Sequence, residues 1–265
     1  QVSSAVVAVS RTLSQHLARD LWIRPSRIVT IPNGVRRPLI DAPSTLRAEL
    51  ELQSGDQLVI AVGNLYPVKG HAVLLDALAL LAARFPRLHV AIAGRGELEH
   101  PLRSRAEELQ VSDRFHLLGL RADIANVLAG ADVFVLPSLS EGVPLALLEA
   151  MLTARPVVAS AVGDVPIVLD GGRAGLLVPP SDAAALAARL EELLSDPARA
   201  RALSAVAQAR ATAAYTFDVM MDAYRALYAR ALGEQAHDRG SKHIREGKRE
   251  ALPEDGAPGK RALVR

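Results

Sequence analysis

Residues 133–154, VFVLPSLSEGVPLALLEAMLTA, contain a complete strand–loop–helix unit. Val133–Leu136 is a short apolar run typical of a buried strand, and Pro144 fits the first turn of a helix that continues to about Ala154. The loop between them carries Glu141. Ligands of open parallel sheets bind at the carboxyl ends of the strands, where this loop would lie. The stretch therefore predicts an α/β fold with a polar site at one edge of the sheet.

The same alternation extends over much of the chain. Strands are expected at residues 58–62, 89–93, 115–118, 133–136, 157–159 and 175–178, with helices at 70–84, 98–110, 124–129, 144–154 and 165–169. Short apolar strands that alternate with helices indicate βαβ units and a parallel sheet covered on both faces. After Ser181 the pattern is helical to about Leu232, with breaks at Pro197 and at Tyr215-Thr216.

The beginning of the chain is organised differently. A strand is expected at 5–9, a helix capped by Ser10 at 11–21, and a second strand at 28–31 that ends at Pro32-Asn33-Gly34. Two strands and one helix cannot bury their apolar faces alone, so this piece is expected to belong to a domain that is mostly missing.

Composition and charge exclude several classes of protein. The chain has no cysteine, which excludes disulfides, thiol nucleophiles and cysteine–zinc sites. Residues 233–265 contain eight Lys/Arg and six Asp/Glu, so this segment carries the whole formal charge of +2 and a nucleic acid is not expected as a partner. No apolar run reaches the roughly 18 residues of a membrane span. There is no Asp-x-Asp triplet and the seven histidines lack ligand spacing, so no metal site is predicted.

A glycine turn follows the first strand of the alternating region. It runs from Gly63 to Gly70, and Lys69 lies where the next helix should begin. A lysine there has the wrong sign for the helix dipole, unless an anion such as a phosphate lies between them. A solvated lysine is an equally good interpretation. The second strand is followed by Gly94-Arg95-Gly96, a turn that is common and therefore weak as a signal.

Glu149 lies in a helix whose neighbours from Leu145 to Leu152 are all apolar. A carboxylate is expensive to bury without hydrogen-bond donors, and helix side chains lean toward the N-terminus, which here faces the expected site. Vicinal ribose hydroxyls are suitable donors. The alternative is that Glu149 is exposed or pairs with an arginine from another helix.

The spacing Glu141-x7-Glu149 resembles the E-x7-E motif of the family-4 retaining glycosyltransferases. Three further segments resemble parts of that family in the right order, so that the likeness covers roughly residues 1–232: the phosphate loop (62–70), the entry to the donor domain (31–35) and the glycine-rich turn after the fifth strand (163–166). The resemblance implies a GT-B fold, in which a Rossmann-like parallel sheet is flanked by helices and an N-terminal acceptor domain precedes it.

With this resemblance we predict five parts of the chain. They are the end of a truncated N-terminal acceptor domain (1–34), a linker (35–56), a nucleotide-sugar-binding Rossmann-like domain (57–196), C-terminal helices (197–232) and a disordered tail (233–265) that is charged and rich in Gly and Pro.

The resemblance also assigns roles to residues. Lys69 would contact the donor pyrophosphate and Glu141 the hydroxyls of the transferred sugar, which makes these two the catalytic candidates, and Glu149 would bind ribose. Gly142 and Val143 would offer N–H groups, and the backbone near Leu118 would hold the base. The expected donor-binding residues are Gly63, Asn64, Lys69, Gly94, Arg95, Leu118, Gly119, Glu141, Gly142, Val143, Pro144, Leu145 and Glu149.

The donor implied is a UDP-, GDP- or ADP-sugar, which is a substrate, and neither a cofactor nor a metal is expected. The acceptor is expected to be a sugar or a lipid-linked molecule, so the location would be cytoplasmic, with peripheral contact at the inner face of the membrane when the acceptor is a lipid. Because the acceptor domain is expected to be missing, we predict that this chain binds nucleotide weakly and transfers little or no sugar.

The sequence departs from the family pattern at several positions. Asn64 stands where the family often has arginine, and Arg95 is the candidate substitute for that phosphate contact. Asp164 and Ile167 replace a glycine and a glutamate of the glycine-rich turn, and Arg36 replaces an aspartate.

Two other functional classes are compatible with parts of the sequence. A non-catalytic nucleotide-sugar-binding module would explain Asn64 and Ile167 as early losses. An NAD-dependent oxidoreductase would need G-x-G-x-x-G after the first strand, where this chain has Gly63-Asn64-Leu65, so it ranks last.

Overall fold

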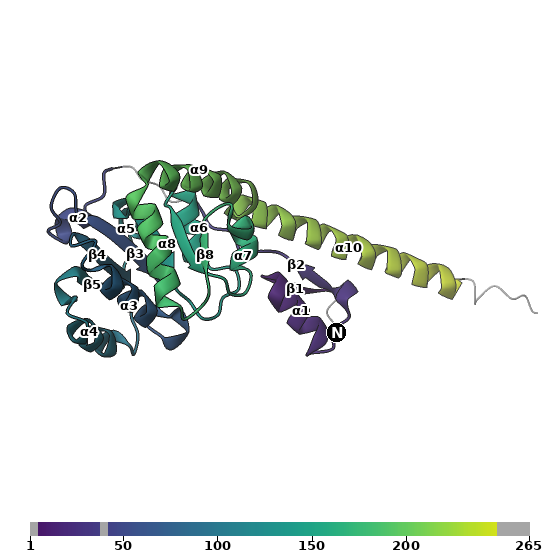
Figure 1. Cartoon of the computed structure of the whole chain (residues 1–265). Helices are drawn as coiled ribbons and strands as arrows, with labels where there is room; N and C mark the ends of the chain where they lie inside the picture. Colours follow the sequence, from purple (N-terminus) through teal and green to yellow (C-terminus); the bar gives the residue numbers. More distant parts are fainter. Residues whose placement is uncertain (1–4, 38–41, 248–265) are drawn as a thin grey trace, which may run out of the picture. The chain divides into compact units, whose positions relative to one another are not determined.

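The computed structural model describes the backbone of residues 5–37 and 42–247, and side chains as far as residue 232. Its centre is a six-stranded sheet, parallel throughout, in the order β5-β4-β3-β6-β7-β8 (Figure 1). The strands are β3 (Gln57–Val62), β4 (Leu88–Ala93), β5 (Phe115–Gly119), β6 (Val133–Leu136), β7 (Val157–Ser160) and β8 (Leu176–Val178). The chain runs outward from β3 to β5 on one side and from β6 to β8 on the other, so the strand order reverses between β3 and β6. A doubly wound sheet of this kind binds ligands at that reversal.

Helices cover both faces of this sheet (Figure 1). The helices within and after the sheet are α3 (His71–Leu81), α4 (Glu99–Glu108), α5 (Ile124–Gly130), α6 (Leu145–Leu152), α7 (Val165–Val168), α8 (Ala183–Ser195) and α9 (Pro197–Ala214). Short 3-10 turns lie at Pro67–Lys69 (η2), Ser112–Arg114 (η3) and Asp170–Gly172 (η4). The predicted α/β architecture is confirmed, with strand and helix boundaries shifted by a few residues at most.

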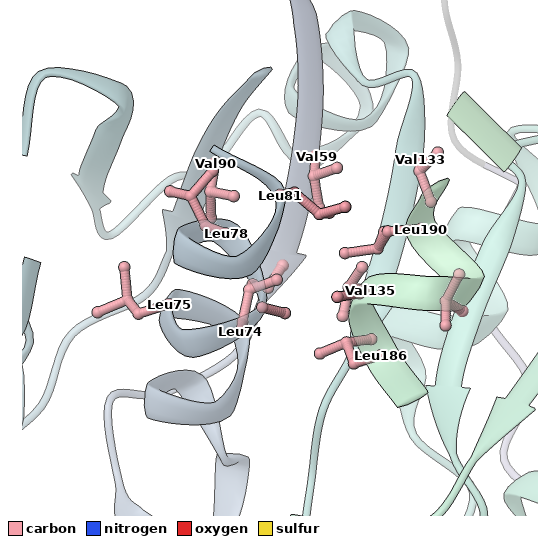
Figure 2. Packing of buried hydrophobic residues seen from close by; sticks show 14 of the residues in the cluster. Val59, Leu74, Leu75, Leu78, Leu81, Val90, Val133, Val135, Leu186 and Leu190 are labelled. Atoms are coloured by element: carbon pink, nitrogen blue, oxygen red, sulfur yellow. The ribbon is translucent and has the colours of Figure 1, made fainter. Parts of the chain in front are cut away.

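The core follows from strand alternation. Val59, Val90 and Val133 point to the face covered by α3, α4 and α8, where they pack against leucines of α3 and α8 (Figure 2). Leu58 and Phe134, one residue along their strands, point to the opposite face and are fully buried there. Because successive side chains of a strand point to opposite faces, nearly continuous apolar strands are what a sheet buried on both sides needs.

The first segment forms a separate two-stranded parallel sheet, β1 (Val6–Ala8) with β2 (Ile28–Thr30). Helix α1 (Arg11–Arg19) begins at Ser10, whose Oγ accepts a hydrogen bond from the Leu13 N–H at 3.0 Å, as expected for an N-cap. A 3-10 turn, η1 (Pro25–Arg27), precedes β2. After β2 the chain passes beside residue 216, where Val35 pairs with Thr216 in an isolated parallel bridge. The predicted linker (35–56) contains one short helix, α2 (Leu46–Glu49), that the sequence analysis did not predict.

The C-terminal helices begin where the sequence predicts breaks. Pro197 is the first residue of α9, and α10 (Phe217–Gly247) follows Tyr215-Thr216. The described helix continues to Gly247, whereas disorder is expected from residue 233; Glu, Gln, Ala, Lys and Arg in this stretch favour helix. Residues 248–265 lie outside the described part. Two compact units divide the chain, Gln1–Asp222 and Ala223–Arg265. None of the described helices combines the length and the apolar character that crossing a bilayer requires.

Two histidines face each other on neighbouring strands. The Nδ1 of His89 (β4) lies 3.1 Å from the Nε2 of His116 (β5), and the rings are stacked with centroids 5.4 Å apart. One nitrogen must donate and the other accept, which requires a neutral acceptor ring. Burial lowers the pKa of both rings below the ordinary value.

This pair predicts a loss of stability in mild acid. As the pH falls below about 6.5, the unfolded histidines take up protons before the folded ones do, so the free energy of unfolding should decrease. Urea unfolding at pH 7.5 and 5.5 measures the change. H116Q should remove part of it, and H100Q, which changes an exposed histidine, should leave it intact. An equal pH dependence in wild type and H116Q would contradict the assignment.

Candidate functional site

The loops that follow β3 and β6 meet at the carboxyl edge of the sheet, on either side of the reversal in strand order. The first carries Lys69 and the second Glu141. The Lys69 Nζ and the Glu141 Oε1 lie 2.7 Å apart, and the side chains are 27% and 8% exposed. The two residues predicted to be catalytic are therefore in direct contact, although 72 positions separate them in the chain.

Ser138 is the third member of this group. Its Oγ donates to the same Glu141 oxygen at 2.7 Å, and the residue is fully buried. Glu141 thus keeps a hydrogen-bond donor even if the lysine moves away. The sequence analysis missed Ser138, although its position supplied a signal: it is a polar residue directly behind a buried strand and three residues before the predicted glutamate.

Glycines fix how closely these loops approach each other. Gly70 has φ +64°, and a Cβ there would lie 2.1 Å from the Pro137 carbonyl oxygen. The Leu139 N–H donates to the Val68 carbonyl at 2.8 Å across the same contact. Only a residue without a side chain fits the backbone at Gly70, so the lysine loop and the glutamate loop are held as one rigid structure.

Two details near these loops correct the sequence analysis. Lys69 ends the 3-10 turn η2 instead of starting the helix, since Gly70 is the N-cap of α3. Pro144 is the N-cap of α6, with extended backbone angles (φ −75°, ψ 125°), and the helix begins at Leu145 instead of Pro144. In both places the residue predicted to be in the first turn lies just outside it.

Glu149 lies in α6, half-buried among apolar neighbours. Burial raises the pKa of its carboxyl group above the ordinary range. No hydrogen-bond or ion-pair partner of this carboxylate occurs among the described residues, and no arginine there pairs with it. It is thus a half-desolvated acid without a protein donor, an arrangement that favours a ligand with hydroxyl groups.

His71 is hydrogen-bonded to the backbone of the turn after β3. It is almost fully buried at the start of α3, and its Nε2 lies 3.2 Å from the Asn64 carbonyl oxygen, to which it donates as a neutral ring. Burial lowers the pKa of His71, against the opposing effect of hydrogen bonds to the Asn64 and Gly63 backbone. Its buried Nδ1 has no partner in the described part of the chain.

The other expected donor-binding residues lie along the same edge. They are Gly63 and Asn64 after β3, Gly94 and Arg95 after β4, Leu118 and Gly119 at the end of β5, and Gly142, Val143, Pro144 and Leu145 before or at the start of α6. Asn64 and Arg95 are exposed, and the Gly94 N–H donates to the Gly119 carbonyl at 2.9 Å. Within the described part of the chain, neither Leu118 nor Gly119 is hydrogen-bonded to Lys69 or Glu141, and their place in a common site stays a prediction.

A cavity of about 240 Å³ opens at the opposite, amino edge of the sheet, lined by Gln57, Asp132 and Arg155 among others. The Arg155 guanidinium donates to the Ala131 and Thr153 carbonyls, so its charge is engaged by the backbone. Parallel sheets bind ligands at the carboxyl edge, which makes the Lys69–Glu141 edge the better candidate. Over the described residues, no group of three or more His, Asp or Glu side chains could hold a metal ion.

A family model described as glycosyl transferases group 1 matches residues 44–210, more than half of the chain. The chain belongs to this family. The match includes Lys69, Ser138, Glu141 and Glu149, and it ends within α9. The predicted membership in the retaining family-4 glycosyltransferases is thereby confirmed at the level of the family.

Individual proteins similar to this chain are also glycosyltransferases. The chain is 33% identical over 239 residues to the D-inositol 3-phosphate glycosyltransferase of Kineococcus radiotolerans, covering 82% of this chain and 55% of that protein. It is 36% identical over 149 residues to the UDP-Gal:alpha-D-GlcNAc-diphosphoundecaprenol alpha-1,3-galactosyltransferase of Escherichia coli, covering 54% of this chain and 38% of that protein. The chain therefore spans about half the length of such relatives, or less.

Solved structures share the fold. The C-terminal domain of a group 1 family glycosyl transferase from Francisella tularensis matches with a TM-score of 0.61 at 20% identity, over 69% of this chain and 97% of that one. The Anabaena protein HepE in complex with UDP-glucose matches with a TM-score of 0.79 at 24% identity, over 86% of this chain and 65% of that one. The GT-B prediction is thus confirmed, and this chain corresponds mainly to the C-terminal domain.

The Ser138 contact predicts a measurable loss of stability. S138A leaves Glu141 with a single donor and should lower the free energy of unfolding by about 1–2 kcal/mol. S140A, which changes an exposed serine two residues later, should have an effect within about 0.5 kcal/mol. Chemical unfolding of the two variants beside wild type compares them, and equal stabilities of S138A and S140A would contradict the proposed hydrogen bond.

Proposed function

We propose that this chain supplies the donor-binding half of a retaining glycosyltransferase, which moves a sugar from a nucleoside-diphosphate sugar to an acceptor hydroxyl. The observation that carries the proposal is Glu149, a half-buried carboxylate without a partner among the described residues, on the helix that starts beside the Lys69–Glu141 pair. Two vicinal ribose hydroxyls would satisfy both of its oxygens.

Lys69 is the counter-charge for the diphosphate. In its present place it neutralises Glu141, so the pair carries no net charge before the donor arrives. A diphosphate would offer Lys69 a stronger partner, while Ser138 still donates to Glu141. Glu141 is then left to accept hydrogen bonds from the hydroxyls of the transferred sugar.

The chemical step needs stabilisation of a leaving phosphate. As the bond between the anomeric carbon and the phosphate oxygen breaks, negative charge grows on the phosphate and the carbon becomes oxocarbenium-like. Lys69 would stabilise that charge, together with the N–H groups of Gly142 and Val143 in the loop before α6. The acceptor oxygen attacks from the same face and its proton passes to the departing phosphate, which gives retention without a metal ion.

The acceptor belongs to the other half of a GT-B enzyme. We propose a sugar or lipid-linked acceptor, met in the cytoplasm or at the inner face of the membrane, and little or no transfer by this chain alone. Two similar proteins support the donor class, since the Escherichia coli relative is a UDP-Gal-dependent galactosyltransferase and Anabaena HepE forms a complex with UDP-glucose. A non-catalytic nucleotide-sugar-binding module is the second candidate, favoured by the exposed Asn64 where the family often has an arginine.

Calorimetric titration of the chain with UDP, GDP and ADP, without metal, tests the donor site. One nucleotide should bind saturably, and K69Q should weaken its binding by roughly tenfold or more, because a charge-assisted contact to phosphate is lost. R103Q, which changes an exposed arginine on α4, should bind as wild type does. Absence of binding to folded wild-type chain would refute the proposal for this chain.

Glu149 predicts opposite changes in stability and affinity. Because burial disfavours its charge, E149Q should be as stable as wild type at pH 7.5, or more stable, while its nucleotide affinity falls by roughly tenfold or more. Thermal unfolding and titration of the same sample give both values. E107Q, at an exposed glutamate near the end of α4, is the matched control and should change neither. If E149Q binds nucleotide as wild type does, the ribose assignment is wrong.

A further inference from the structure

The carboxylate of Asp164 is bound to the first turn of α1. It accepts hydrogen bonds from the Arg11 N–H at 2.6 Å, the Thr12 N–H at 2.9 Å and the Thr12 hydroxyl at 2.6 Å. Asp164 is only 3% exposed. The positive end of the helix thus has its anion supplied by the protein, from a position 152 residues later in the chain.

The turn that carries Asp164 also contacts the glutamate loop. Gly163 has φ +52°, and a Cβ there would lie 1.8 Å from the Glu141 carbonyl oxygen. No other residue fits this approach without moving Glu141. Asp164 follows Gly163 directly in the chain. A displacement of Asp164 would therefore also move Gly163 and the backbone of Glu141 against which it lies.

The first segment touches the next two residues of the same loop. A Cβ at Gly142 would lie 3.8 Å from the Ser10 Oγ, and the Asn33 side-chain amide donates to the Val143 carbonyl at 2.9 Å. Each residue of the 141–143 loop therefore has its own neighbour. Gly163 lies against Glu141, Ser10 lies near Gly142, and Asn33 donates to Val143. The three loop residues are the ones that the proposed function assigns to the sugar and the phosphate.

Away from these anchors the contact is loose. A cavity of about 190 Å³ lies between the segment and the donor domain, and its walls include Ser10, Pro32, Val143, Asp164 and Tyr215. Backbone hydrogen bonds of Val35 with Tyr215 and Phe217 hold the end of the segment. The hydrogen bonds at Asp164 and Asn33 are the ones that join its α1 and the turn after β2 to the donor domain.

We propose that Asp164 is a positioning residue that latches α1 onto the 141–143 loop, so that the placement of the first segment sets the affinity for the nucleotide sugar. The second half of this inference rests on the proposed function, and the first does not. Releasing the latch would exchange three hydrogen bonds to a carboxylate for hydrogen bonds to water, and hydrogen bonds to charged groups favour the attached state. Anything that moves α1 away would loosen the donor loop, and bound donor would by the same coupling hold α1 in place.

The matched pair of variants is D164A and D196A. Asp196 likewise accepts two backbone N–H bonds at a helix start, from Ala198 at 3.1 Å and Arg199 at 2.9 Å. It caps α9, and among the described residues α9 makes no hydrogen bond to the 141–143 loop. Both variants remove a carboxylate from the start of a helix; D164A should lose more stability than D196A, because Asp164 is buried and accepts three hydrogen bonds whereas Asp196 is exposed and accepts two. Trp22 is the only tryptophan of the chain, lies just beyond α1 and is 89% exposed, so its fluorescence reports on the segment.

The experiment measures two properties of the full chain: time-resolved anisotropy of Trp22 and affinity for UDP, GDP and ADP. D164A should add a fast rotational component to Trp22 and weaken nucleotide binding by about fivefold or more, and D196A should do neither. Unchanged anisotropy in D164A overturns the latch. A faster Trp22 with unchanged affinity overturns the coupling to donor binding.

If wild type binds none of the nucleotides, the proposed function fails and the anisotropy still decides the latch. T12V tests it by a second route, since it removes one hydroxyl donor and leaves the carboxylate in place. It should shift the Trp22 anisotropy in the same direction as D164A and by less. No shift in either variant would overturn the proposal even if D164A were poorly folded.

Discussion

The contact between Lys69 and Glu141 is the interaction on which the rest of the site depends. It joins the loops after β3 and β6 across the reversal of strand order, the one place in a doubly wound sheet where adjacent loops diverge and leave room for a ligand. The close approach of Gly70 to Pro137 and the hydrogen bond from Ser138 to Glu141 add to the attraction between the two charges. The sheet, Gly70 and Ser138 together thus define where the ion pair lies.

Three carboxylates near this edge have three different environments. Glu141 is satisfied by a lysine and a serine, Asp164 by the first turn of α1, and Glu149 by nothing in the described part of the protein. Buried acids are normally supplied with donors. The half-buried Glu149 lacks a protein donor, which separates it from Glu141 and Asp164 and is the reason why we propose it as a ligand contact.

The sequence was sufficient for the fold because short apolar strands alternate regularly with helical segments along it. Strands such as Val133–Leu136 are continuously apolar, as a sheet covered on both faces requires, and Ser10 and Pro197 mark helix starts by local chemistry. The local charge pattern singles out Lys69 and Glu149, the resemblance to the E-x7-E motif singles out Glu141, and the roles of all three stay predictions. The sequence was not sufficient for the contact of Ser138 or the role of Asp164: the position of Ser138 behind a strand is a signal without a named partner, and an aspartate in a turn is locally ordinary. Their partners lie in other parts of the chain, and only the assembled fold brings Asp164 to Arg11 and Thr12.

A crystal structure of the chain grown with UDP, GDP or ADP is the most direct test of the account. We expect the ribose hydroxyls within hydrogen-bonding distance of the Glu149 carboxylate, and the Lys69 ammonium moved from Glu141 to a phosphate oxygen while Ser138 still donates to Glu141. A nucleotide bound instead at the amino edge, beside Gln57 and Arg155, or bound with the Lys69–Glu141 contact intact and Glu149 free, would contradict it.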